Sequence, residues 1–157
     1  MDKTLVEAAK TAIEVGYTHL DGAEVYNTES ELGAAIKQSK APRDKLFVTT
    51  KVISNIGDIP NAIDSSLKKL GLEYVDLYLI HAPFFAKGDR KALQTAWAAM
   101  EDVLASGKAK SIGVSNYFKD DLEATLATCK VRPAINQVSL VMHDNTCISD
   151  LSKLRSG

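Results

Sequence analysis

Apolar residues in this chain follow two spacings, one typical of helices and one typical of buried strands. Segments rich in Ala, Glu and Lys, such as residues 5–15, carry apolar residues three or four positions apart and end at a glycine. Short runs of β-branched and aromatic residues, such as residues 46–51, lie between them. The predicted helices are 5–15, 29–37, 60–70, 92–106 and 120–128, and the predicted strands are 17–21, 46–51, 74–80, 110–114 and 134–138.

Strand and helix alternate through the chain at about 30 residues a repeat, which is the size of a βα unit. The strands are apolar on both faces, as expected for a parallel sheet that is covered by helices. Alternation alone fits a doubly wound sheet as well as a barrel. Polar residues end successive strands, however, and in a (β/α)8 barrel the chemistry comes from the carboxyl ends of several strands. We therefore expect an α/β fold, an incomplete (β/α)8 TIM barrel with about five parallel βα units.

Composition and charge exclude several classes of function. A chain of 157 residues predicts one domain. Its net charge of −1, with acidic and basic residues interspersed, is not that of a protein that binds nucleic acid or an anionic membrane. No apolar run approaches the roughly 20 residues of a membrane-spanning helix, and charges stand where a signal peptide needs an apolar core. Cys129 and Cys147 form no spacing motif, so we expect a cytoplasmic protein without a metal site.

Proton-handling side chains end the first three predicted strands, at Asp21, Lys51 and His81, and Tyr26 follows five residues after the first. A phenol with an ordinary pKa of about 10 is a poor proton donor to a carbonyl at neutral pH. A neighbouring ammonium lowers the pKa of a phenol, and a carboxylate can hold that ammonium charged. A neutral imidazole can donate a hydrogen bond to a substrate oxygen. The set therefore indicates proton transfer to a carbonyl, with a cofactor that carries hydride.

Each of these residues, taken singly, has a commoner structural explanation. An aspartate after a strand usually forms a turn or caps a helix, a loop tyrosine is usually half-buried, and a lysine at a strand end is usually solvated. A histidine before a proline is usually a core residue. Ser115 and Asn116, after the fourth strand, would form an ordinary N-cap pair. Their shared place at the ends of consecutive strands favours one site.

Several stretches, in this order along the chain, carry a resemblance to a known family. They are GYTHLD at 16–21 with YNTE at 26–29, LFVTTK at 46–51, LGLEYVDLYLIH at 70–81, SIGVSN at 111–116 and PAINQ at 133–137. The chain resembles the aldo-keto reductases, which are NADP-dependent carbonyl reductases on a (β/α)8 barrel. By this resemblance Tyr26 is the proton donor, Lys51 is its charged partner, Asp21 pairs with Lys51, and His81 orients the substrate carbonyl.

The resemblance also implies a cofactor and a class of partner. Ser115, Asn116 and Gln137 resemble the residues that hold the nicotinamide carboxamide, and Asp21 would approach the nicotinamide ribose. The implied cofactor is NADP(H), and the implied partner is a small-molecule carbonyl or alcohol.

The chain departs from the family pattern in three places. Gly22 replaces the usual threonine, the first strand and the phosphate-binding strands are not found, and the sequence after Gln137 diverges. We expect a partial barrel over residues 1–138 and a divergent tail over 139–157, with a weak helix at 148–154 or no order. The alternative function is a truncated, catalytically inactive barrel that associates with another chain through its exposed sheet edges.

Overall fold

The structure, a computed structural model that describes residues 1–138, is built on one parallel sheet of five strands in the order β1-β2-β3-β4-β5. The strands are β1 (His19–Asp21), β2 (Phe47–Val52), β3 (Val75–Ile80), β4 (Ala109–Ser115) and β5 (Asn136–Gln137). The helices are α1 (Lys3–Glu14), α2 (Glu29–Ser39), α3 (Ile59–Leu70), α4 (Arg90–Ala105) and α5 (Lys119–Leu126). Short 3-10 turns follow the first three strands, namely η1 (Glu24–Tyr26), η3 (Ile56–Asp58) and η4 (Pro83–Ala86), and η2 (Arg43–Lys45) precedes β2. The predicted alternation of five parallel βα units is confirmed.

Capping residues explain where several helices begin and end. The carboxylate of Asp2 accepts hydrogen bonds from the backbone N–H groups of Thr4 and Leu5 at the start of α1. Asp58 caps α3 in the same way, and Gly71 ends that helix with a φ of 66°, a conformation that glycine adopts without strain. The predicted end of the helix at residue 70, directly before this glycine, is therefore confirmed.

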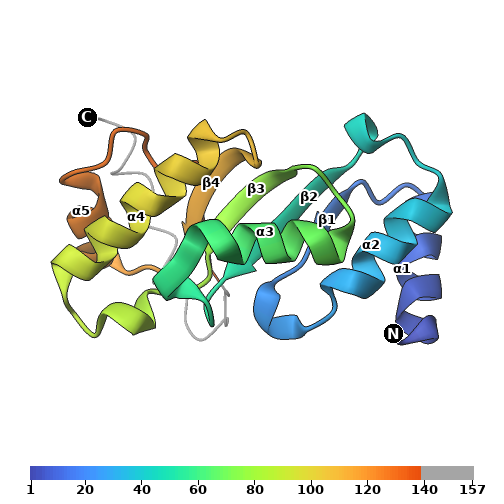
Figure 1. The fold of residues 1–157 in the computed structure, drawn as a ribbon, viewed down its shortest axis with the longest axis horizontal. Coiled ribbons are helices and arrows are strands. Elements are labelled where there is room, and N and C mark those ends of the chain that lie inside the picture. The colour runs from blue at the N-terminus through green and yellow to red at the C-terminus, as the bar shows by residue number, and fades with distance from the viewer. Residues whose placement is uncertain (139–157) are drawn as a thin grey trace, which may run out of the picture.

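The hydrophobic core lies between the sheet and the helices α1–α4, which cover one face of it (Figure 1). The apolar face of α3, which consists of Ile59, Ile63, Leu67 and Leu70, is buried against this core. Trp97 and Met100 of α4 and Tyr78 of β3 are also fully buried there. Gly33 of α2 packs so closely on the end of α3 that an added Cβ would lie 2.2 Å from the Leu70 carbonyl oxygen.

The register of the strands brings their carboxyl ends to one edge of the sheet. Asp21 pairs with Thr49, Lys51 with Leu79, and Ser115 with Gln137. The turns that follow β1, β2 and β3 lie along the lower edge of the molecule in Figure 1. Side chains that end different strands can therefore meet at this edge.

The outer strands are shorter than the sequence predicted. β1 begins at His19 rather than at residue 17, and β5 spans Asn136–Gln137 rather than 134–138. Ala134 N still donates to the Ile112 carbonyl, but the ladder with β4 joins Val114 with Asn136 and Ser115 with Gln137. The predicted tail over 139–157 lies outside the described residues. Over residues 1–138, no helix has the length and apolar character needed to cross a membrane.

Candidate active site

A buried ammonium group occupies the centre of the site. Lys51 of β2 is 2% exposed, and its Nζ forms an ion pair with Asp21 of β1. The same Nζ donates a hydrogen bond of 3.0 Å to the Gly22 carbonyl oxygen. Two oxygen acceptors from the end of one neighbouring strand thus compensate the burial of the charge.

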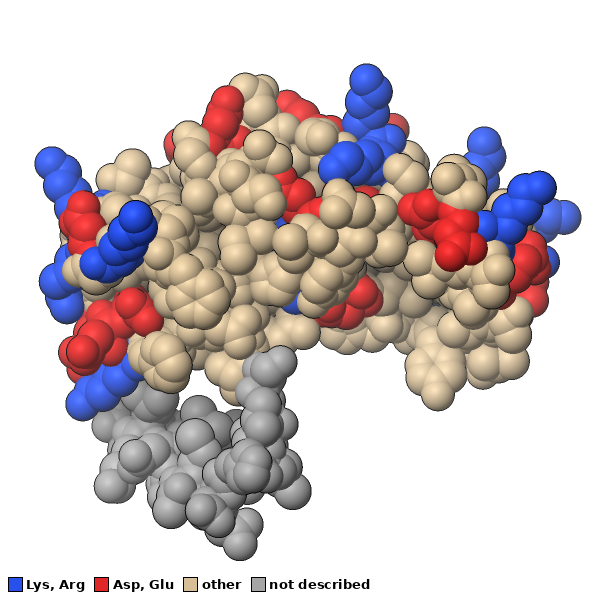
Figure 2. Space-filling view, turned by 90° about the horizontal axis from the view of Figure 1, so that it is seen from below, with Lys and Arg blue, Asp and Glu red and all other residues tan. Residues whose placement is uncertain are grey.

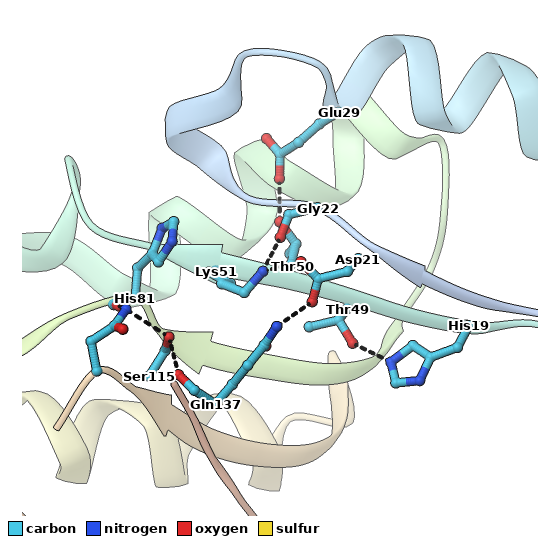
Figure 3. Close-up of polar contacts among 11 residues, drawn as sticks. His19, Asp21, Gly22, Glu29, Thr49, Thr50, Lys51, His81, Ser115 and Gln137 are labelled. Carbon is cyan, nitrogen blue, oxygen red and sulfur yellow. Dashed lines mark hydrogen bonds and ion pairs between the residues drawn. The ribbon is translucent and has the colours of Figure 1, made fainter. Parts of the chain in front are cut away.

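Asp21 also links the first strand of the sheet to the last. Its Oδ2 accepts a hydrogen bond of 3.0 Å from the Gln137 side-chain amide, although the two residues are 116 positions apart. Figure 3 shows Asp21, Lys51 and Gln137 directed towards one another from three strands. The sheet is therefore curled enough for side chains of its two outer strands to meet.

Tyr26 lies beside this charged pair on the η1 turn. Its ring centroid is 5.6 Å from Lys51 Nζ and 5.6 Å from the His81 ring centroid, with an angle of 82° between the two ring planes. The side chain is 51% exposed, so one side of the phenol is open to solvent. Asn27 ends the turn in the left-handed conformation, at φ 55°, which asparagine tolerates better than most residues.

His81 follows β3, and its backbone N–H donates to the Val52 carbonyl oxygen at 2.9 Å. Burial lowers the pKa of the imidazole, the Lys51 charge lowers it further, and the Asp21 charge opposes them. The net shift is below the ordinary value of 6.5, so the ring is neutral at pH 7. Its Nδ1 is buried and has no hydrogen-bond partner within the described residues.

A second polar group joins the ends of β3, β4 and β5. Ser115 Oγ donates to the Gln137 carbonyl oxygen at 2.6 Å, and Asn116 N donates to the same oxygen at 3.0 Å. The Asn116 side-chain amide donates to the His81 carbonyl oxygen and to Ser115 Oγ, both at 3.0 Å. The hydroxyl of Ser115 and the side-chain amide of Asn116 are therefore in contact beside the Gln137 backbone, whose side-chain amide is bonded to Asp21.

The structure brings all the predicted site residues to the carboxyl ends of the strands. Figure 2, seen from below the view of Figure 1, looks onto this edge, and most of the middle of that face consists of residues other than Lys, Arg, Asp and Glu. The arrangement joins a half-exposed phenol, a buried ammonium, a neutral imidazole and neutral hydrogen-bonding groups. Such a set can transfer a proton to a neutral polar substrate. Within residues 1–138, no cluster of His, Cys, Asp and Glu side chains could hold a metal ion.

Two buried carboxylates near the site received no role from the sequence, although one of them, Glu29, ends the YNTE stretch. Glu24, 7% exposed, accepts hydrogen bonds from the loop after β2, and Glu29, 2% exposed, accepts one from Thr50 Oγ1 at 2.7 Å (Figure 3). Glu29 also pairs with Lys69. In the sequence both are ordinary acidic residues of a short loop and a helix start. Only their nearness to Tyr26 could have drawn attention to them.

Comparison with known proteins gives consistent results for the whole described chain. Residues 1–153 match the model of the Aldo/keto reductase family. An NAD/NADP-dependent indole-3-acetaldehyde reductase of Schizosaccharomyces pombe is 43% identical over 138 residues, which cover 88% of this chain and 49% of that protein. An NADPH-dependent alpha-keto amide reductase of Saccharomyces cerevisiae is 42% identical over 140 residues, which cover 86% and 45%. The chain spans about half the length of these curated relatives.

Solved structures agree with the fold. The crystal structure of an aldo/keto reductase from Brucella melitensis superposes with a TM-score of 0.81 and 38% identity, over 89% of this chain and 55% of that one. The five parallel strands are thus a curled part of a (β/α)8 barrel, as the sequence predicted.

Proposed function

The chain belongs to the aldo/keto reductase family, and from this premise we propose that its site serves the NADP(H)-dependent reduction of an aldehyde or ketone to an alcohol, with Tyr26 as the proton donor. The relatives' names support this class of reaction, since one contains an aldehyde, another an alpha-keto amide, and both a nicotinamide cofactor. The observation that carries the proposal is the position of the half-exposed Tyr26 ring beside the buried Lys51–Asp21 pair.

Proton donation is the task proposed for Tyr26. Lys51 is buried and charged, and its ammonium favours the negative charge that a phenol acquires as it loses its proton. Asp21 compensates Lys51 and keeps it from being an isolated buried charge. Proton transfer from a positioned side chain accelerates a reaction by about 10²- to 10⁴-fold.

Orientation of the substrate oxygen is the task proposed for His81. Its ring is perpendicular to the Tyr26 ring at 5.6 Å, so both groups can reach one oxygen atom between them. Because the pKa of His81 is lowered by burial and by Lys51, the imidazole is neutral and donates a hydrogen bond without adding a charge.

The donor set at the ends of β4 and β5 fits a nicotinamide carboxamide. Asn116 and Gln137 each carry an amide with both donors and an acceptor, and Ser115 carries a hydroxyl. We propose that these three residues hold the carboxamide and that Asp21 lies near the ribose. A nicotinamide cofactor, when bound, supplies the hydride.

The test combines cofactor binding and turnover in two matched variants. NADPH fluorescence titration gives the dissociation constant, and steady-state assays on a panel of aldehydes and ketones give kcat. We expect Tyr26→Phe to bind NADPH as the unchanged chain does but to lose about 10²- to 10⁴-fold in kcat. Tyr17→Phe, which alters another exposed tyrosine, should leave both values unchanged.

Turnover that survives Tyr26→Phe unchanged would contradict the assigned role. A folded chain that neither binds NADPH nor turns over any carbonyl would instead favour the alternative, an inactive barrel that associates with another chain. Sedimentation velocity on the same sample measures such association directly.

A further inference from the structure

We infer that Glu24 is a positioning residue, which holds the Tyr26 ring beside Lys51 and His81 by tying the η1 turn to the loop after β2. The inference rests on the proposed function, because it is the role of Tyr26 that makes its position matter. It adds a residue that does not touch the reacting atoms itself.

Glu24 is the first residue of η1, and its carboxylate closes on the loop that follows Lys51. Oε2 accepts hydrogen bonds from the backbone N–H groups of Ile53 and Ser54 at 3.0 Å and of Asn55 at 3.4 Å. Oε1 accepts a further one from the Asn55 side-chain amide. Both oxygens of one carboxylate thus bind a single loop.

This contact is well placed to determine where Tyr26 lies. Within η1 itself, Tyr26 N donates to the Ala23 carbonyl and Asn27 N to the Glu24 carbonyl, and these bonds shape the turn without attaching it to the sheet. The Tyr26 side chain makes ring contacts with Lys51 and His81 at 5.6 Å and is half exposed. A half-exposed ring with two such contacts depends on the backbone of the turn for its position.

The other attachments of this segment lie on both sides of the turn. After it, Glu29 accepts a hydrogen bond from Thr50 Oγ1 at 2.7 Å. Gly22 N donates to the Thr49 carbonyl at 2.9 Å, and the Gly22 carbonyl accepts from Lys51 Nζ at 3.0 Å. Gly22 and Glu29 thus hold the two flanks of the turn, and Glu24 is the residue of η1 whose own side chain is bonded to the loop after β2. Because Tyr26 lies between the flanks, this bond within η1 is the one nearest to it along the chain.

The ionisation of Glu24 agrees with this role. Burial opposes the charge, but the hydrogen bonds from Ile53, Asn55 and Ser54 outweigh it, and the pKa of the carboxyl lies below its usual range. Glu24 is therefore an acceptor on both oxygens at neutral pH, which is what a loop of donor groups requires.

The test measures the position of the Tyr26 ring without cofactor or substrate. Nuclear Overhauser effects between the Tyr26 and His81 ring protons, in a sample with labelled aromatic residues, report on their contact. Three variants separate the effect of the length of the Glu24 side chain from the effect of its charge. Glu24→Ala removes the carboxylate, Glu24→Asp keeps its charge but shortens the side chain, and Glu24→Gln keeps its length.

We expect the ring-to-ring effect to disappear in Glu24→Ala, to weaken in Glu24→Asp and to remain in Glu24→Gln, whose amide oxygen can still accept from the loop. In a chain that turns over substrate, Glu24→Ala should lose about 10²-fold in kcat, as expected for a misplaced catalytic group, with NADPH affinity unchanged. Glu24→Gln should recover most of that loss.

Asp76→Ala is the matched control, because Asp76 is another buried carboxylate that accepts from a backbone N–H, that of Val48, but at the opposite ends of the strands. It should keep the effect between Tyr26 and His81. Wild-type intensity in folded Glu24→Ala or Glu24→Asp, or its loss in Asp76→Ala as well, would overturn the inference. The nuclear Overhauser effect between the two rings is measured without turnover. An inactive chain would therefore count against the proposed function but not against the positioning role of Glu24.

Discussion

The two ends of the strands contain similar groups in different arrangements. At the amino ends, Arg43 Nη2 pairs with Asp76 Oδ2 at 2.7 Å, and Asp76 also accepts from Val48 N at 2.9 Å. The Tyr74 ring lies close to two cations there, with Arg43 at 4.2 Å and Lys110 at 3.9 Å from its centroid. At the carboxyl ends, Lys51 pairs with Asp21, and the Tyr26 ring is 5.6 Å from the cation.

The difference lies in how the groups are satisfied. Arg43 also donates to the carbonyl oxygens of Leu46 at 2.8 Å and Tyr74 at 3.1 Å, so both of its terminal nitrogens close on the backbone where β2 and β3 begin, and only its buried Nε has no partner within residues 1–138. At the carboxyl end, Tyr26 is half exposed and His81 Nδ1 has no partner within residues 1–138. A cation, a carboxylate and a phenol stabilise a fold when their hydrogen bonds are made to the backbone. They can take part in a reaction when a hydrogen-bonding group remains accessible to a substrate.

Substitution of the central lysine should have the largest effect and should separate the two ends most clearly. Lys51→Met replaces a buried ion-pair partner with an apolar side chain of similar length. We expect kcat to fall by about 10²- to 10⁴-fold. The free energy of unfolding should fall as well, because removal of one partner of a buried ion pair leaves the other charge, that of Asp21, without its counter-charge.

Steady-state assays and urea unfolding measure the two quantities in the same preparation. Lys110→Met is the control, since it removes a cation beside Tyr74 at the amino ends and should leave kcat unchanged. Normal turnover by Lys51→Met would remove the distinction between the two ends.

A loss of stability without a loss of turnover is expected at the amino ends. Asp76→Ala leaves the Val48 N–H without its acceptor and the Arg43 guanidinium without its counter-charge, although Arg43 keeps its bonds to two backbone carbonyl oxygens. The free energy of unfolding should fall by about 2–3 kcal/mol. Turnover per folded molecule should stay the same, because no predicted site residue contacts Asp76. Urea unfolding checks the loss of stability, and a loss below about 0.5 kcal/mol, the range of ordinary surface substitutions, would contradict the assignment of this cluster to stability.

A smaller effect should appear in the pH dependence of stability. Folded His81 binds its proton less tightly than in the unfolded chain, whose ordinary pKa is 6.5. Neutral His81 therefore makes its full contribution to the free energy of unfolding above pH 6.5. This contribution is lost as the pH falls through the lower pKa of the folded state. The slope for one group is at most about 1.4 kcal/mol per pH unit.

Urea unfolding from pH 8 to pH 5 measures this dependence. His81→Gln should flatten the curve below pH 6.5, whereas His19→Gln, which leaves His81 in place, should keep the His81 part of the slope. An unchanged curve in His81→Gln would show that burial of this imidazole at the carboxyl ends carries no energetic consequence.

The sequence by itself determined the order of the elements and the edge on which the site lies. Helix periodicity, the stop at Gly71 and the apolar strands predicted the alternation that the structure contains. Residues that end parallel strands must share an edge, so Asp21, Lys51 and His81 could be grouped without coordinates. These inferences depend on local spacing and on a general property of parallel sheets.

Only the tertiary structure decided which of these groups touch one another. The bond between Asp21 and Gln137, 116 positions apart, depends on the curl of the sheet, which no local pattern encodes. The burial of Glu24 depends on where the loop after β2 passes, since a carboxylate in a short loop is equally compatible with solvent. Contacts between distant segments follow from the summed twist and register of every strand between them, and these are set when the whole core packs.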